Sequence, residues 1–108
     1  MAGTAILVLT QLPDLAAARA LARVLVEARL AACVSVGAPV ESLYHWRGKI
    51  ETATEVPLVV KTRSDRYVDV EAAIRAHHPY ELPEILAVAS LHGFAPYVEW
   101  IVAETGGA

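Results

Sequence analysis

The chain has 108 residues, 56% of them apolar and 19% charged, with a net charge of −3. This length suits a single domain, 1–108, and the acidic balance argues against nucleic acid as a partner, because nucleic-acid binding usually needs a basic surface. No apolar run reaches the ~18 residues of a membrane-spanning helix and no basic segment precedes the first apolar stretch, so we expect neither a membrane partner nor a signal peptide.

The first third of the chain predicts a strand followed by a helix. Thr4 to Thr10 is a short run rich in Ile, Val and Leu, which is typical of a strand buried on both faces. Pro13-Asp14 then signals a turn and a helix start. From Leu15 to Leu30 a charged stripe lies opposite apolar residues at helical spacing and predicts an amphipathic helix. Its apolar positions are Ala18, Leu21, Ala22 and Leu25.

The middle of the chain predicts one long antiparallel hairpin. Cys33–Trp46 and Lys49–Thr62 have the strand pattern, and Arg47-Gly48 marks the tight turn between them. Gly and Pro at 37–39 predict a bulge or bend in the first strand, and Pro57 predicts a bulge or an unpaired stretch in the second. A domain of this size cannot cover such a hairpin, so we expect its tip to lie on another subunit.

The last third predicts helix, strand and helix. Ser64 or Asp65 is expected to cap the first helix, Glu84 to Leu91 forms a strand that is apolar on both faces, and Pro96 starts the final helix. The stripes expected to be buried are Tyr67, Val70, Ile74 and His77 in the first helix and Tyr97, Trp100 and Ile101 in the second, which ends at Gly106-Gly107. The order is β-α-β-β-α-β with a C-terminal helix, an α+β, ferredoxin-like sandwich with its helices on one face of the sheet.

The segment His77-His78-Pro79-Tyr80-Glu81-Leu82-Pro83-Glu84 gathers polar groups around two prolines. Pro79 disfavours helical backbone at His78, so the helix should end there, and Pro83 stiffens the connection to the next strand. Neutral imidazoles bind copper or zinc, so we expect a weak metal site at His77 and His78. The alternative is that both histidines interact with free carbonyls at the end of the helix.

Several segments, in order along the chain, resemble the CutA family of divalent-cation tolerance proteins. They are LAACV at 30–34, SLYHWRGKIE at 42–51, Glu55 through Lys61-Thr62, HHPYELPE at 77–84, and Tyr97 to Ile101. The resemblance implies a cytoplasmic homotrimer of ferredoxin-like subunits that exchange their hairpins. It also implies a link to divalent metal tolerance, with copper as a weakly bound ligand, and no established reaction, so we expect no enzyme.

Two residues depart from the family pattern. Some family members are described as binding copper through a cysteine at the end of the first strand together with the paired histidines, and Thr10 stands at that position here. A hydroxyl is a poor ligand for a soft metal, which weakens the expected affinity for copper. His45 stands where the family usually carries an aromatic residue beside Trp46, and it is either an additional metal ligand or only a solvated strand residue.

A small-ligand site is expected at a cleft between subunits. Lys61 ends an apolar strand, so its ammonium needs a polar partner or an anionic ligand, and Glu84 is held by Pro83. The hairpin of a neighbour would bring in two further residues. The predicted lining is Cys33, Lys61, Tyr80 and Glu84, with Trp46 and Glu51 from the hairpin. The alternatives are a Lys61–Glu84 ion pair that only holds the interface, and an inert buried Cys33 thiol.

Three other functions share features with this chain. The trimer of the resembling family is similar to that of the PII signalling proteins, which makes a small-molecule signalling trimer the alternative. An acylphosphatase-like enzyme shares the topology but needs an anion-binding loop with Arg after the first strand, and Thr10-Gln11-Leu12-Pro13 supplies neither. An RNA-binding module would need exposed aromatics in a basic central strand, which Leu58-Val59-Val60-Lys61 does not provide.

Overall fold

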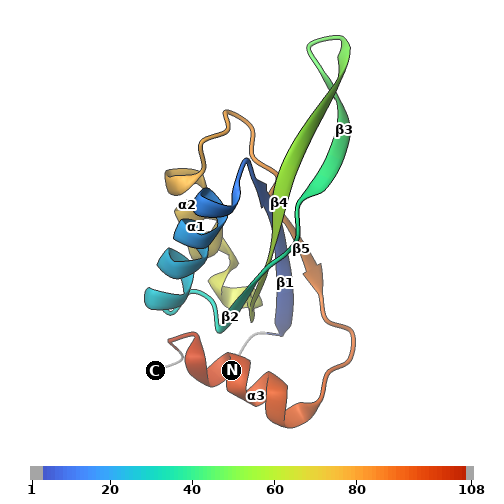
Figure 1. The fold of residues 1–108 in the computed structure, drawn as a ribbon. Coiled ribbons are helices and arrows are strands. Elements are labelled where there is room, and N and C mark those ends of the chain that lie inside the picture. The colour runs from blue at the N-terminus through green and yellow to red at the C-terminus, as the bar shows by residue number, and fades with distance from the viewer. Residues whose placement is uncertain (1–3, 107–108) are drawn as a thin grey trace.

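The computed structural model describes residues 4–106. Their elements are β1 (Ala5–Leu12), α1 (Leu15–Glu27), β2 (Cys33–Val36), β3 (Val40–Trp46), β4 (Lys49–Arg63), the 3₁₀ turn η1 (Ser64–Arg66), α2 (Tyr67–His77), β5 (Leu86–Ala89) and α3 (Ala95–Glu104). The predicted α+β class is confirmed, with an antiparallel sheet in the order β2-β4-β1-β5 and β3 paired with β4. Helices α1 and α2 cover one face of this sheet, and α3 crosses its lower end (Figure 1).

The core lies between the sheet and the two helices α1 and α2. Alternate residues of β1 and β4 point toward the helices and are buried, as period-two patterning requires. The core residues include Ile6, Val8, Leu12, Val56, Leu58 and Val60 from the sheet and Leu21, Leu25, Val70 and Ile74 from the helices. Asp14 starts α1 as predicted, because its Oδ1 accepts the Ala17 N–H at 2.8 Å. The helix ends at Glu27, earlier than expected, where Arg29 takes a left-handed φ of 57°.

The hairpin has the predicted bulge and turn, and β4 continues through Pro57 as one strand. Val36 lies opposite Leu58 and Val40 opposite Glu55, so the three residues 37–39 face only two residues of β4. A Cβ at Gly37 would lie 2.8 Å from Cγ of Pro57, which explains the glycine. Pro57 lies opposite this bulge, as expected, but on its other side it pairs with Gln11 of β1, and its carbonyl still accepts the Gly37 N–H at 2.9 Å. At the tip, Arg47 and Gly48 both have positive φ, the pattern of a type I′ turn.

The C-terminal third differs from expectation in several places. Neither Ser64 nor Asp65 caps α2, because η1 precedes it and the Ser64 Oγ accepts the Thr4 N–H instead. His77 is exposed rather than part of the buried stripe of α2. In α3 only Ile101 is buried, and the aromatic rings expected beside it are exposed. Gly106 has a φ of 67° at the end of α3, and the second expected terminator, Gly107, lies outside the described residues.

The sheet face opposite α1 and α2 is apolar where β1 pairs with β5, and this part is only partly covered. Strand β5 is shorter than predicted and lies at the sheet edge, where Leu86 is 62% and Val88 48% exposed. By register these two residues share their face with the half-buried Leu9 and Leu7 of β1. We call these four residues the open apolar face. Within residues 4–106, no helix combines the length and apolar character needed to cross a bilayer.

Candidate functional site

A cavity of about 880 Å³ lies between the β3–β4 hairpin and the loop of residues 79–84. Strand β1 contributes Gln11 to it, and the hairpin contributes the consecutive residues 42–46 together with Glu55. The loop contributes Tyr80, Glu81 and Glu84, and the two prolines at its ends limit its backbone freedom. The cavity is therefore built from three chain segments that are far apart in sequence.

The cavity wall carries negative charge. Glu55, Glu81 and Glu84 line it, and none of the described lining residues is a lysine or an arginine. Arg47, at the hairpin tip, reaches back to Glu81 with 3.3 Å between Nη2 and Oε2, and its guanidinium lies 5.3 Å from the centre of the Trp46 ring. That ion pair is exposed and weak, so the electrostatics of the wall favour a positively charged ligand.

Tyr80 is the most strongly perturbed titratable group of the cavity. Burial of its phenol, together with a hydrogen bond to the Glu55 carboxylate, raises the pKa of Tyr80 to about 12. The phenol therefore keeps its proton at neutral pH and donates it toward Glu55. Tyr80 and Glu55 form a polar pair that joins the 79–84 loop to the hairpin.

The two histidines predicted as metal ligands differ in their contacts. His77 is exposed, and its Nδ1 lies 2.9 Å from the Ala73 carbonyl one turn back, so its Nε2 faces solvent. His78 is buried, with Nε2 2.6 Å from the Gln11 carbonyl and Nδ1 accepting the Tyr80 N–H at 3.1 Å. His78 could bind a metal only by giving up one of these bonds, whereas His77 could do so without loss.

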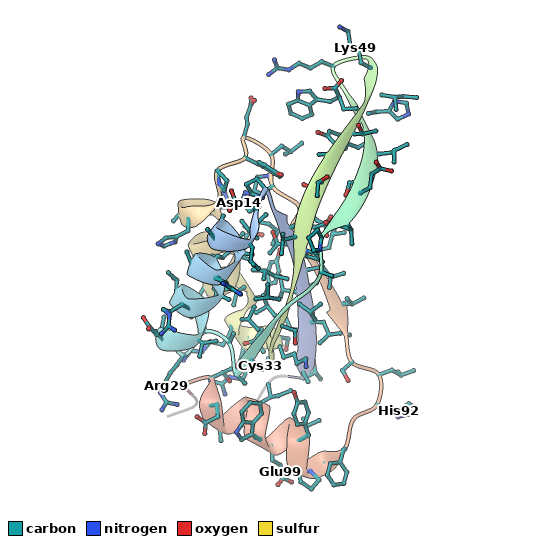
Figure 2. All side chains as sticks on the ribbon, viewed as in Figure 1. Asp14, Arg29, Cys33, Lys49, His92 and Glu99 are labelled. Carbon is teal, nitrogen blue, oxygen red and sulfur yellow. The ribbon has the colours of Figure 1, made fainter. Side chains whose placement is uncertain are left out.

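Cys33 and Lys61 lie at the other end of the sheet from the cavity. They face each other across β2 and β4, and Nζ of Lys61 lies 5.9 Å from the centre of the Tyr97 ring. Figure 2 places Cys33 near α3, far below Lys49 at the hairpin tip. The proposed Lys61–Glu84 pair does not form within the chain. Within one chain, the residues predicted to line the cleft therefore lie at two opposite ends of the sheet.

The remaining predicted residues fall near the cavity or outside it. Trp46 and His45 line it, while Glu51 is exposed on β4 opposite Tyr44. Thr10 lies on the helix-facing side of β1 and is only 1% exposed, so a cysteine there would face the core rather than the cavity. No group of three or more His, Cys, Asp or Glu side chains in the described part of the chain is placed to hold a metal ion.

Sequence reasoning missed Gln11 as a residue of the cavity wall, and it considered Glu55 only as one carboxylate of an acidic surface formed with Glu51, Glu81 and Glu84. Gln11 Nε2 donates to Oε1 of Glu84 at 3.4 Å, and its Oε1 is buried without a partner among residues 4–106. An amide near the end of an apolar strand was the available signal for Gln11. The place of Glu55 beside Tyr80 could not be predicted, because it depends on the bulge that redirects the hairpin.

Comparison with known proteins identifies the family. The model of the CutA1 divalent ion tolerance protein family matches residues 6–104. The chain belongs to this family. The resemblance seen in the sequence is thereby confirmed, and the family is named for tolerance of divalent cations, not for a reaction.

Relatives and solved structures cover most of the chain. A divalent-cation tolerance protein CutA from Archaeoglobus fulgidus is 40% identical over 89 residues, which cover 82% of this chain and 86% of that protein. A CutA homolog from Xenopus laevis is 42% identical, but the chain spans only 59% of its length. The crystal structure of CutA from Xylella fastidiosa matches with a TM-score of 0.92 and 40% identity, covering 95% of this chain and 99% of that one. A further match, also with a TM-score of 0.92, is a structure described as a periplasmic divalent cation tolerance protein CutA from A. fulgidus.

Proposed function

We propose that the protein acts in tolerance of, or response to, divalent metal ions, copper among them, and binds a cation or small ligand at clefts between the subunits of a cytoplasmic homotrimer. The observation that carries this proposal is the negative cavity beside the hairpin, whose wall within one chain holds Glu55, Glu81 and Glu84 without a lysine or arginine. Membership of a family named for divalent ion tolerance agrees with a cationic ligand.

The open apolar face supports self-association. Soluble monomers rarely leave a continuous apolar surface of this kind unpaired at a sheet edge, because it invites association. The strand order supports a ferredoxin-like subunit. The β3–β4 hairpin extends beyond the helices (Figure 1), where a neighbouring subunit would meet it. In such an assembly the hairpin of one subunit, with Trp46 and Glu51, would approach Cys33 and Lys61 of the next.

Metal binding at the histidines would be weak and of the surface type. Nε2 of His77 is the free imidazole nitrogen of the predicted pair, and the chain places no third ligand beside it in the described residues. A metal competes with protons for an imidazole nitrogen, so we expect affinity to fall as the pH is lowered. Thr10 adds no ligand, since its hydroxyl is buried in the core.

A small-molecule signalling role, as in PII-like trimers, is favoured by the size of the cavity. Small-molecule sites usually measure about 300–1,000 Å³, and this cavity lies within that range. Three aromatic side chains, Tyr44, Trp46 and Tyr80, line it beside the carboxylates. An organic cation and a hydrated metal ion are both compatible with such a wall.

Native mass spectrometry tests this proposal, with copper, zinc or no metal added. We expect a three-chain species without metal and added mass when copper or zinc is present. Glu55→Gln and Glu84→Gln should reduce the added mass, while Glu99→Gln, an exposed carboxylate on α3 away from the cavity, should not (Figure 2). A single-chain species would contradict the proposed trimer. Equal metal uptake in all three variants would contradict metal binding in the cavity.

A further inference from the structure

We propose that His78 is the positioning residue of the cavity: it holds the 79–84 loop and Tyr80 in place through both ring nitrogens and does not serve as a metal ligand. The proposal deepens the function proposed above and depends on it only for the statement that this cavity is the working site. It rests on contacts of His78 to β1, to the loop and to the Tyr80 ring.

The two hydrogen bonds of His78 define the form of its imidazole. A backbone carbonyl only accepts, so the contact of 2.6 Å between Nε2 and the Gln11 oxygen requires a proton on Nε2. A backbone N–H only donates, so the contact of 3.1 Å from the Tyr80 nitrogen requires a bare Nδ1. His78 is therefore the neutral Nε2–H tautomer, with both nitrogens used and only 8% of the residue exposed.

The place of His78 in the chain explains why an imidazole is needed there. Its backbone ends α2, with the His78 N–H still bonded to the Ile74 carbonyl and its ψ already extended at 134°. Pro79 has no N–H, so Tyr80 carries the first free amide of the loop. The His78 side chain supplies the acceptor for that amide, as an Asx side chain does in a turn.

The same side chain also orients the Tyr80 phenol. The His78 and Tyr80 rings are tilted by 52° with centroids 4.7 Å apart, a favourable geometry for an aromatic pair. The Tyr80 ring then extends toward Glu55 on the hairpin. One buried imidazole thus connects β1, the end of α2 and the cavity wall.

His77, the neighbouring residue, is free for a different role. Its Nδ1 contacts the Ala73 carbonyl, and the exposed ring leaves Nε2 without a protein partner among the described residues. The pair predicted from sequence therefore divides into one accessible ligand, His77, and one internal support, His78.

Amide hydrogen exchange at Tyr80 tests whether His78 holds the loop through the Tyr80 N–H. In His78→Asn, the Oδ1 of the new side chain can accept the Tyr80 N–H, whereas His78→Ala offers no acceptor. We expect Tyr80 exchange to rise by up to about tenfold in His78→Ala, the factor for one ordinary hydrogen bond, and to stay near the wild-type rate in His78→Asn. His77→Ala is the matched control and should leave Tyr80 unchanged. Equal exchange in wild type and His78→Ala would overturn the proposal.

The second part of the proposal is that His78 does not bind metal. Nitrogen NMR of the wild-type imidazoles tests it without any substitution, with zinc alone as the probe. We expect His78 to show a protonated Nε2 and a bare Nδ1, both unmoved at saturating zinc. A zinc-induced shift of either His78 nitrogen, or a proton on Nδ1, would contradict the proposal. Failure of zinc to shift His77 would count against metal binding at the histidines and leave the tautomer and exchange results to decide the role of His78.

Discussion

Two threonines on the helix-facing side of the sheet differ in what their hydroxyls contact. Oγ1 of Thr10 is buried with no hydrogen-bond partner among residues 4–106, while Oγ1 of Thr62 donates to the Leu30 carbonyl at 2.7 Å. A buried polar group without a partner costs about 1–3 kcal/mol. We therefore expect Thr10→Val to raise the free energy of unfolding by about 1 kcal/mol, measured by guanidinium denaturation.

Thr62→Val is the matched control for Thr10→Val. It removes a hydroxyl from an equally buried position on the neighbouring strand, but there it leaves the Leu30 carbonyl without its donor. We expect this variant to lose stability, so the two identical replacements should have opposite signs. A loss of stability in both would mean that the Thr10 hydroxyl has a partner that the contacts of the chain do not include.

Stability at high pH should depend on Tyr80. Its folded-state pKa of about 12 lies above the ordinary value of 10, so the neutral phenol stabilises the fold. This contribution is complete below pH 10 and is lost as the pH rises from 10 toward 12. We expect Tyr80→Phe to flatten the decline of the unfolding free energy over that range, measured by urea denaturation at several pH values.

The carboxylate of Glu55 can be tested in the same pH range. Glu55→Gln removes the negative charge beside the phenol, so the pKa of Tyr80 should move down toward 10 while its burial remains. Absorbance of the phenolate follows this titration directly, with Tyr80→Phe identifying the signal. An unchanged Tyr80 titration in Glu55→Gln would mean that burial alone accounts for the shift.

At the scale of elements, three arginines hold the carboxyl end of α3. Arg66 donates from Nε to the Thr105 carbonyl at 2.8 Å and from Nη2 to the Gly106 carbonyl at 3.0 Å. Arg63 also donates to the Thr105 carbonyl, at 3.3 Å, and Arg29 contacts Glu104. The carbonyls at the end of a helix have no N–H partner within the helix, and these arginines supply one. Their positive charges also interact favourably with the negative end of the helix dipole.

Arg66→Gln should therefore loosen α3. Hydrogen bonds from charged groups contribute about 1.5–3 kcal/mol each, and we expect a loss of about 2 kcal/mol in unfolding free energy. The substitution should increase amide hydrogen exchange more in α3 than in α1. Arg75→Gln is the control, because Arg75 is exposed on α2 and takes part in none of the ion pairs of residues 4–106.

The elements that the sequence predicted well are those with local signals. Local sequence pattern was enough to predict three features, because each depends on a few neighbouring residues. They are the cap at Asp14, the turn at Arg47-Gly48 and the bulge at 37–39. Exposure of Leu86 was not predictable, because the two-sided apolar pattern of β5 does not reveal that it occupies a sheet edge.

The candidate site could be predicted only in part, for the same reason. Tyr80 and Glu84 were found because two prolines hold them in one short segment. Whether Lys61 joins them depends on strand register and on neighbouring chains, and in the single chain it lies at the other end of the sheet. The different roles of His77 and His78 depend on a contact to Gln11, sixty-seven residues away in sequence.

At the scale of the whole molecule, the open apolar face should control assembly. Replacing Leu86 and Val88 with lysine places charge on this exposed edge, where the isolated chain has little packing to lose. We expect light scattering to show three times the 11.6 kDa chain mass for the wild type and a single-chain mass for the double variant. An obligate interface of this kind should bury more than ~2,000 Å².

Val68→Lys is the control for the assembly experiment. Val68 is an exposed apolar residue on α2, on the other side of the sheet from the open apolar face. This variant should keep the wild-type mass. Assembly that survives lysine at both 86 and 88 would place the interface elsewhere, with the exposed rings of α3 as the next candidates.

The central place of β4 also determines the order in which the chain can fold. This one strand pairs with β1, β2 and β3, and the other partner of β1, β5, comes later still in the sequence. A nascent chain that has emerged only to residue 48 therefore has β1 with both edges unpaired. Pairing across some fifty intervening residues is slow to form, so the rate-limiting step should include β1 meeting β4. Chaperone contact during synthesis should accordingly be strongest before residues 49–63 leave the ribosome.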